Sequence, residues 1–248
     1  MSSIIQERRE QVAIIRLDRP EKFNALTPEM IVALRDIFTT LANERDLRAV
    51  ILTANGDEAF CAGSGITDVA GSSEPELLFR QIESCHVPVI AAVNGVAADE
   101  GCELAFACHL RIASVHAQFS LPGAKSRLDA GNYGKQRLAR EAGEEAALEL
   151  LSGKVVSAGE AMRLGLINRV VPAVELLARA EDLAREIAQL APLAIRACLE
   201  AVTEGNQLPL AEGLALETKL FASLFDSDDV REGTTAFLEK RAPVFKGT

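Results

Sequence analysis

Four short apolar runs in the first half of the chain constrain its fold more than any other feature. Each run is rich in valine, isoleucine or alanine and is bounded by turn-forming or charged residues, a pattern typical of a buried β-strand. The runs are residues 11–17 (QVAIIRL), 48–54 (RAVILTA), 88–93 (PVIAAV) and 110–114 (LRIAS). Residues 27–44 predict a helix with Thr27 as its N-cap and Pro28 at its first position. The sequence up to about residue 135 therefore predicts a mixture of strands and helices.

From about residue 136 onward the chain predicts mostly helices. Apolar residues recur at helical spacing, and turn or capping residues separate the segments. The expected helices are residues 144–153, closed by Gly153, then 174–191, 192–204, 209–224 and 227–240, the last capped by Ser227 or Asp228. Residues 166–172 predict one late strand. The polar stretch GSSEPE (71–76) predicts a loop.

The charge, the cysteine content and the lack of long apolar runs argue against nucleic-acid binding, a secreted protein and a membrane-spanning protein. The chain has 26 Lys and Arg against 36 Asp and Glu, a formal net charge of -10, which disfavours binding to nucleic acid or to an anionic membrane. The five cysteines include no C-x-x-C pair, so we expect reduced thiols and a cytoplasmic location. The first residues lack the apolar segment of a secretory signal, and no apolar run is long enough to span a bilayer.

Six segments, in the same order along the chain, resemble the crotonase superfamily, that is, the enoyl-CoA hydratase/isomerase family. They are LDRPEKFNALTPEM (17–30), AFCAGSGITDV (59–69), PVIAAVNGVAADEGCELAFACHLRIAS (88–114), GKQRLAREAG (134–143), SAGEAMRLGLINRVVP (157–172) and DVREGTTAFLEKRAPVFKG (229–247). The resemblance implies an α/β fold of the crotonase (ClpP/crotonase-like) type, a spiral of ββα units. It also implies a spiral core at residues 1–190 and a helical C-terminal trimerisation region at residues 191–248. We expect a homotrimer or a homohexamer.

The resemblance further implies an acyl-CoA thioester substrate, with coenzyme A as part of that substrate, and neither a separate cofactor nor a metal. Two backbone N–H groups would form an oxyanion hole, which stabilises the enolate oxygen of the thioester. At the matching positions these donors are the N–H groups of Ser64 and Glu100. A helix N-terminus is a suitable place for the second donor, because its first N–H groups are unpaired and its dipole favours negative charge. The general acid/base of the family matches Glu103.

Contacts to coenzyme A are also implied by the resemblance. Residues 23–26 and 61–66 would contribute mainly backbone groups, with Ala25, Ala62 and Ile66 as the expected CoA-binding residues. Lys240 resembles a C-terminal position that reaches a CoA phosphate in the assembled oligomer.

The sequence departs from the family pattern in three loops that are expected to line one pocket. Gly123 stands where the family's hydratases have their second catalytic glutamate. Asp99 and Glu100 stand where those hydratases have a glycine-rich turn, and Ser64-Gly65 stands where the family commonly has Ala-Asp. Because the scaffold segments keep to the pattern, we infer that the pocket has been altered as a unit.

These departures leave three mechanisms open. In the first, Glu103 is the only general acid/base and moves a proton between carbons, as in the enoyl-CoA isomerases of the family. In the second, Asp129 takes the place of the missing glutamate, in a different reaction of the family such as decarboxylation, C–C bond hydrolysis or thioester hydrolysis. In the third, hydratase activity is weak or lost, because a general acid–base group contributes roughly 10²–10⁴-fold. A non-enzymatic binding protein of the same fold is a further alternative, although the net charge of -10 disfavours RNA as its ligand.

Other polar residues have simpler explanations than catalysis. Asp99 and Glu100 could be the solvated acidic start of a helix, where the dipole favours them, and a metal site formed with Glu103 is a less favoured alternative. The histidines lie beside predicted strands, and we expect them to be structural. They are His86, His109 and His116.

Overall fold

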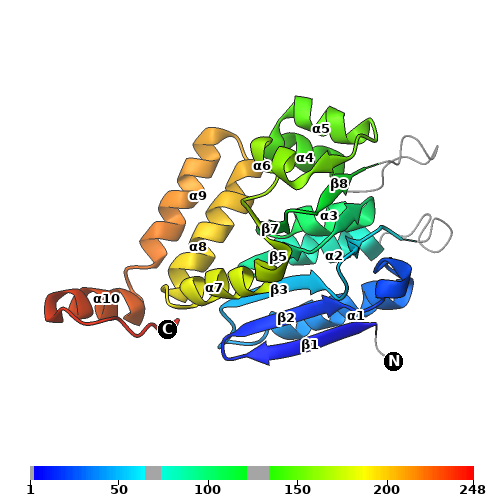
Figure 1. The fold of residues 1–248 in the computed structure, drawn as a ribbon. Helices are drawn as coiled ribbons and strands as arrows, with labels where there is room; N and C mark the ends of the chain where they lie inside the picture. Colours follow the sequence, from blue (N-terminus) through cyan, green and yellow to red (C-terminus); the bar gives the residue numbers. More distant parts are fainter. Residues whose placement is uncertain (1–2, 65–73, 122–133) are drawn as a thin grey trace.

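The computed structural model describes residues 3–64, 74–121 and 134–248, and they are built around a six-stranded sheet of order β1-β2-β3-β5-β7-β10 (Figure 1). Its strands are β1 (Ile4–Arg9), β2 (Val12–Leu17), β3 (Ala49–Ala54), β5 (Val89–Val93), β7 (Leu110–Ser114) and β10 (Arg169–Val171). β1 is antiparallel to β2, and the other neighbouring pairs are parallel. Every residue of β3 and β5 is buried, which confirms that the apolar runs form strands covered on both faces.

A second, four-stranded sheet of order β4-β6-β8-β9 lies next to the first. Its strands are β4 (Ala59–Cys61), β6 (Val96–Ala98), β8 (Gln118–Ser120) and β9 (Val156–Ser157). Three successive turns of the chain each give one strand to the large sheet, one strand to the small sheet and then a helix: β3-β4-α2, β5-β6-α3 and β7-β8-α4. The helices are α2 (Glu74–Glu83), α3 (Glu100–Ala107) and α4 (Gly134–Ala142). The predicted spiral of ββα units is therefore confirmed.

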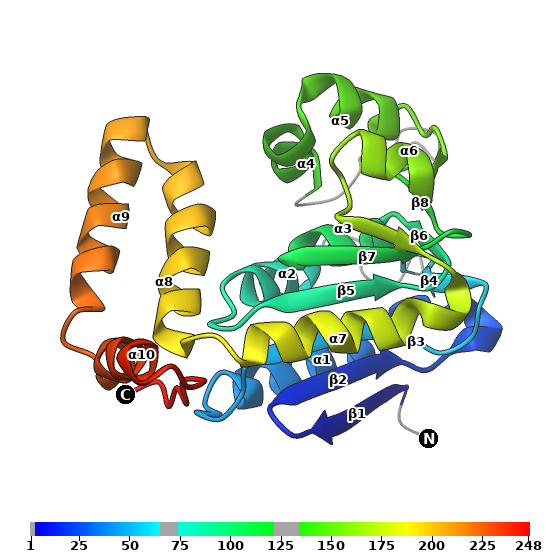
Figure 2. The ribbon, with the colours of Figure 1, turned by 60° about the vertical axis from the view of Figure 1, so that its left-hand side comes forward.

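Helices cover both faces of the large sheet (Figure 2). On one face α7 (Leu176–Ala188) buries Leu176, Ala180 and Ala184 against side chains of β2, β3, β5 and β7. On the other face α1 (Pro28–Leu41) buries an apolar stripe that belongs to the main core cluster. The hydroxyl oxygen of Thr27 accepts a hydrogen bond from the Met30 N–H at 3.2 Å, so the predicted N-cap is confirmed.

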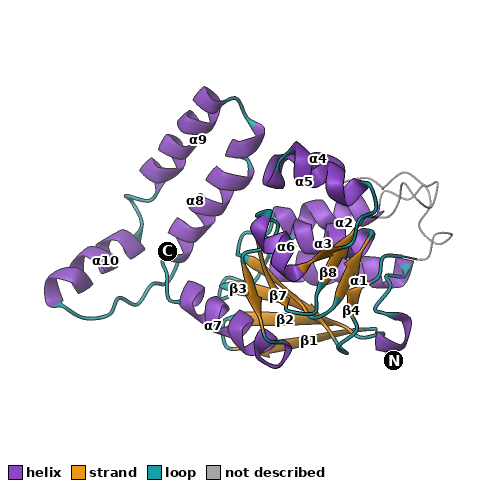
Figure 3. Cartoon of the chain, turned by 45° about the horizontal axis from the view of Figure 1, so that its top comes forward, coloured by secondary structure: helices purple, strands orange, loops and turns teal. Residues whose placement is uncertain are grey.

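The three C-terminal helices receive little cover from the rest of the chain (Figure 3). They are α8 (Pro192–Thr203), α9 (Leu210–Ser223) and α10 (Asp228–Glu239). No residue of α8 or α9 is buried, and apolar side chains stay exposed, for example Leu210 at 79% and Phe237 at 82%. Ser227, and not Asp228, caps α10, because its hydroxyl accepts from the Val230 N–H.

The remaining elements are short helices. They are η1 (Pro20–Lys22), α5 (Glu144–Leu151), α6 (Ala158–Arg163), η3 (Ala173–Glu175) and η4 (Gly205–Gln207). The loop predicted at residues 71–76 is wrong for residues 74–76, which begin α2, and residues 71–73 lie outside the described residues. The late strand is shorter than predicted and covers only Arg169–Val171. Within the described residues, no helix is long and apolar enough to cross a bilayer.

Candidate active site

The candidate site begins where the loop after η1 runs beside the end of β4. The Leu26 N–H donates to the Gly63 carbonyl at 2.8 Å, and the Ala62 N–H donates to the Phe23 carbonyl at 3.0 Å. Leu26 and Ser64 also form an isolated parallel bridge. Residues 23–26 and the described residues 61–64, and with them Ala25 and Ala62, are therefore adjacent.

Asn24 holds this loop in place, a role that was not predicted from the sequence. The residue is 1% exposed and has a left-handed backbone with φ of 55°. Its side-chain amide donates to the carbonyls of Asn55 at 2.9 Å and Ala59 at 2.8 Å, and its Oδ1 accepts from the Arg19 N–H at 2.9 Å. Asparagine suits such a position because it tolerates positive φ and bonds to nearby backbone groups. It fixes the loop that contains Ala25 against the start of β4.

The first turn of α3 packs directly on the end of β4. A Cβ atom at Gly101 would lie 1.9 Å from the Cys61 carbonyl oxygen, so only glycine fits there. Gly63 has φ of +93°, and a Cβ atom built on it would lie 3.1 Å from Glu100 Oε2 and 3.2 Å from Asp99 Cβ. The backbone turn at 63–64 and the start of α3 therefore face each other without an intervening side chain.

The two expected oxyanion-hole residues contact each other in an unexpected way. The Ser64 N–H donates a hydrogen bond to Glu100 Oε2 at 3.0 Å. Both residues are half-buried. The N–H of Glu100 is the first of α3 and belongs to the groups that have no acceptor within a helix. The structure thus brings the two predicted donor residues into contact, and the Glu100 carboxylate accepts from the Ser64 N–H.

Asp99, directly before α3, has a backbone conformation that suits glycine. Its φ is 47° and its ψ is -122°, which costs a residue with a Cβ atom roughly 1–3 kcal/mol. Its carbonyl accepts from the N–H groups of Cys102 and Glu103, at 2.9 and 3.0 Å, and its own N–H donates to the Ser120 carbonyl at 3.0 Å. The turn therefore keeps a glycine-like shape although an aspartate occupies it.

Glu103 lies in the first turn of α3 and is 4% exposed. Burial raises the pKa of the neighbouring Cys102 thiol well above its ordinary value, and the nearby carboxylate of Glu103 raises it further. A carboxylate with so little exposed surface, at a helix N-terminus, is suited to exchanging a proton with a bound substrate. Ser64, Glu100 and Glu103 therefore come from two adjoining segments, the end of β4 and the first turn of α3.

The structure does not place the other predicted site residues beside Glu103. Ile66, Gly123 and Asp129 lie outside the described residues. Lys240 is the C-cap residue of α10, with φ of 55°. Because α10 lies far from the first turn of α3 in both ribbon views, the structure does not unite Lys240 with Glu103 within one chain. Within the described part of the chain, no group of three or more His, Cys, Asp or Glu side chains could hold a metal ion.

His109 is structural, as predicted. Its Nδ1 accepts from the Val89 N–H at 3.0 Å, and its Nε2 donates to the Glu83 carbonyl at 3.0 Å. Burial is the main reason why the pKa of His109 falls to about 4. The neutral ring therefore connects the end of α2 to the start of β5 and takes no part in the candidate site.

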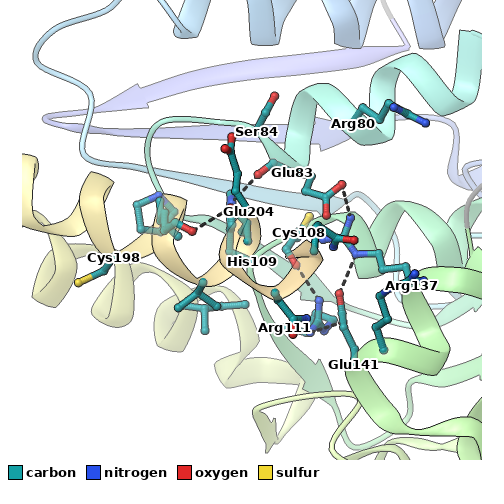
Figure 4. Close-up of a pocket in the computed structure, with 18 of the residues that line it drawn as sticks. Arg80, Glu83, Ser84, Cys108, His109, Arg111, Arg137, Glu141, Cys198 and Glu204 are labelled. Carbon is teal, nitrogen blue, oxygen red and sulfur yellow. Dashed lines mark hydrogen bonds and ion pairs between the residues drawn. The ribbon is translucent and has the colours of Figure 1, made fainter. Parts of the chain in front are cut away.

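A cavity of about 1480 Å³ lies between α8 and the core (Figure 4), and no residue of the first turn of α3 lines it. Four of its charged residues pair with one another: Arg111 Nη2 lies 3.1 Å from Glu141 Oε2, and Arg137 lies 2.7 Å from Glu141 and 3.1 Å from Glu83. Apolar side chains of α8, such as Leu199, line the other wall. The cavity therefore resembles an uncovered packing surface rather than a catalytic site.

Comparison with known proteins gives the same family along nearly the whole chain. The profile of the enoyl-CoA hydratase/isomerase family matches residues 7–248. A short-chain-enoyl-CoA hydratase of Clostridium acetobutylicum is 34% identical over 251 residues, which cover 97% of this chain and 96% of the relative. A crotonyl-CoA hydratase of Syntrophomonas wolfei is 37% identical over 253 residues, with 98% and 97% covered. The crystal structure of an enoyl-CoA hydratase from Bacillus anthracis has a TM-score of 0.96 at 35% identity and 100% coverage of both chains.

Proposed function

Because the chain belongs to the enoyl-CoA hydratase/isomerase family, we propose that it binds an enoyl-CoA thioester and moves a proton on it with the carboxylate of Glu103. The observation that carries this proposal is the contact between Ser64, after β4, and Glu100, with Glu103 buried in the same first turn of α3. The enoyl-CoA class is taken from the names of the relatives, two of which are hydratases of short-chain or crotonyl-CoA thioesters.

In this proposal the backbone of the two adjacent segments, 23–26 and 61–64, binds the coenzyme A part of the substrate. The thioester oxygen accepts hydrogen bonds from the N–H groups of Ser64 and Glu100. These donors stabilise the negative charge that develops on the oxygen as the enolate forms, and one such donor is worth roughly 10²–10³ in kcat. The dipole of α3 adds to this effect because its positive end points to the same place.

Glu103 then takes a proton from one carbon of the acyl chain and returns it to another, which shifts the double bond. One carboxylate is sufficient for this reaction, whereas hydration also needs a positioned water and a proton donor. Glycine occupies position 123, where the hydratases of the family have their second glutamate. We therefore propose that double-bond isomerisation is faster than hydration, and the reaction with Asp129 as a second acid stays a prediction.

The test compares Glu103→Gln with Glu145→Gln, since both glutamates lie in the first turn of a helix and Glu145 is exposed on α5. Isomerisation of 3-enoyl-CoA and hydration of 2-enoyl-CoA thioesters of several chain lengths are measured for both variants. We expect Glu103→Gln to lower kcat roughly 10²–10⁴-fold and Glu145→Gln to leave it unchanged. Wild-type activity in Glu103→Gln would overturn the proposal, and loss of activity in Asp129→Asn alone would favour the alternative reaction.

We also propose that residues 191–248 pack on other copies of the chain in a homotrimer or homohexamer. The absence of buried residues in α8 and α9 supports this, because a helix of 14 residues with exposed leucine and phenylalanine is marginal without a packing partner. Lys240, at the end of α10, would then reach a CoA phosphate bound by another copy. Sedimentation analysis should give a mass of three or six chains of 26.6 kDa each. A single-chain species of 26.6 kDa at micromolar concentration would contradict the proposal. The cytoplasmic location stays a prediction.

A further inference from the structure

The position of the Glu100 carboxylate has a consequence for substrate binding. Its Oε2 lies 3.0 Å from the Ser64 nitrogen, along the direction in which this N–H donates. The same oxygen faces the α-carbon of Gly63, because a Cβ atom built there would lie only 3.1 Å from it. The carboxylate therefore lies over the turn at 63–64, in the place where the oxygen of a bound thioester would accept its first hydrogen bond.

The charge of Glu100 also acts on the Cys61 thiol, at the end of β4. Burial is the main cause that raises the pKa of this thiol to about 12, and the charge of Glu100 contributes to the rise. The carboxylate of Glu100, a half-buried residue, is therefore close to the end of β4 as well as to Ser64. Its hydrogen bond with Ser64 is charge-assisted and is stronger than one to a neutral carbonyl oxygen.

We propose that Glu100 is a built-in competitor of the substrate: its carboxylate holds the Ser64 N–H in the free enzyme and must leave before a thioester oxygen can bind there. The inference rests on the proposed function, since it assumes that the Ser64 N–H is an oxyanion donor. One N–H makes one strong hydrogen bond, so carboxylate and thioester exclude each other. A carboxylate that stays nearby also opposes the charge that develops on the enolate oxygen.

The Glu100 carboxylate should compete with the carbonyl oxygen of a thioester, but not with free coenzyme A. Free coenzyme A has no carbonyl group at its sulfur, so it does not need the Ser64 N–H. Acetoacetyl-CoA places a carbonyl oxygen there and readily forms an enolate, so it depends on the donor fully. Glu100 is therefore a residue that weakens the binding of thioesters relative to that of free coenzyme A.

The experiment measures the affinities of acetoacetyl-CoA and free coenzyme A by calorimetry for wild type, Glu100→Gly, Glu100→Gln and the control Glu145→Gln. Glu100→Gly keeps the backbone N–H and removes the competitor, so we expect acetoacetyl-CoA to bind about 10- to 100-fold more tightly. Glu100→Gln keeps an acceptor but removes its charge, and we expect a smaller gain. The affinity for free coenzyme A should change less than about twofold in every variant, because none of the substitutions alters the backbone groups of 23–26 and 61–64.

The result separates this inference from the proposed function. If all four proteins bind free coenzyme A and acetoacetyl-CoA with unchanged affinities, Glu100 does not compete and the inference is overturned while the CoA site stands. If none of them binds either ligand, the proposed function fails and the inference fails with it. If Glu100→Gly binds both ligands more tightly by the same factor, the effect is not on the thioester oxygen, and this too overturns the inference.

Discussion

Replacing Gly101 by alanine tests how closely the first turn of α3 packs on the end of β4. A Cβ atom at position 101 would lie 1.9 Å from the carbonyl oxygen of Cys61 and 2.6 Å from its carbonyl carbon. An ordinary contact between carbon and oxygen is about 3.3–3.6 Å, so the two segments would have to separate by more than about 1 Å. Overpacking costs roughly 1–3 kcal/mol, and we expect about 3 kcal/mol, because no rotamer change can move the backbone atoms of Cys61.

The assay is urea unfolding at one fixed protein concentration, which gives the free energy of unfolding of each variant. Gly159→Ala is the matched control, because Gly159 lies in α6 and a Cβ atom there would meet nothing within 4 Å. Gly159→Ala should raise the free energy of unfolding by roughly 0.5–1 kcal/mol, since glycine loses more conformational freedom than alanine does when the helix folds. The two variants should therefore change stability in opposite directions. A Gly101→Ala protein as stable as wild type would refute the reasoning.

Two further predictions concern the turn before α3 and the buried histidine. Asp99→Gly should raise the free energy of unfolding by about 1 kcal/mol, because relief of the strained backbone exceeds the added entropy of the unfolded chain. Asp99→Asn should leave the strain in place, so equal urea midpoints for the two variants would contradict this prediction. The pKa of His109 is about 4 in the folded protein against 6.5 for a free side chain, so the unfolded chain takes up a proton first as the pH falls from 6.5 toward 4. Stability should fall over that range by at most about 3 kcal/mol, and this loss should be absent in urea titrations of His109→Gln.

The sequence predicted the elements that carry a long signal. The strands β2, β3, β5 and β7 follow from apolar runs, and α1, α5 and α7 to α10 follow from helical spacing and caps. The small sheet was not predicted, because β4, β6, β8 and β9 have only two or three residues each, too few to show any periodicity. The start of α2 was missed because its first residues, Glu74 to Glu76, include a proline and two charges that equally suit a loop.

The candidate site was predicted by resemblance and not by pattern. The resemblance gave the position of Glu103 and the acid/base role expected of it, which stays a prediction, and the structure adds that this residue is buried. The support from Asn24 was missed, since its contacts with Asn55 and Ala59 join residues more than thirty positions apart. The direction of the Glu100 side chain could not be predicted, because a motif fixes the place of a backbone N–H but not the rotamer of the side chain beside it.

The turn before α3 shows how strongly its surroundings determine its shape. An isolated aspartate avoids φ of 47° with ψ of -122°, so local preference does not produce this conformation. The hydrogen bond from the Asp99 N–H to the Ser120 carbonyl and the close contact between Gly101 and Cys61 hold the turn from both sides. Because the neighbours impose the conformation, we expect substitutions at 99 and 100 to leave the direction of the backbone N–H groups unchanged. On the proposed function, the acidic pair would then affect the strain of the turn and the competition for the Ser64 N–H, but not the backbone geometry that a thioester would use.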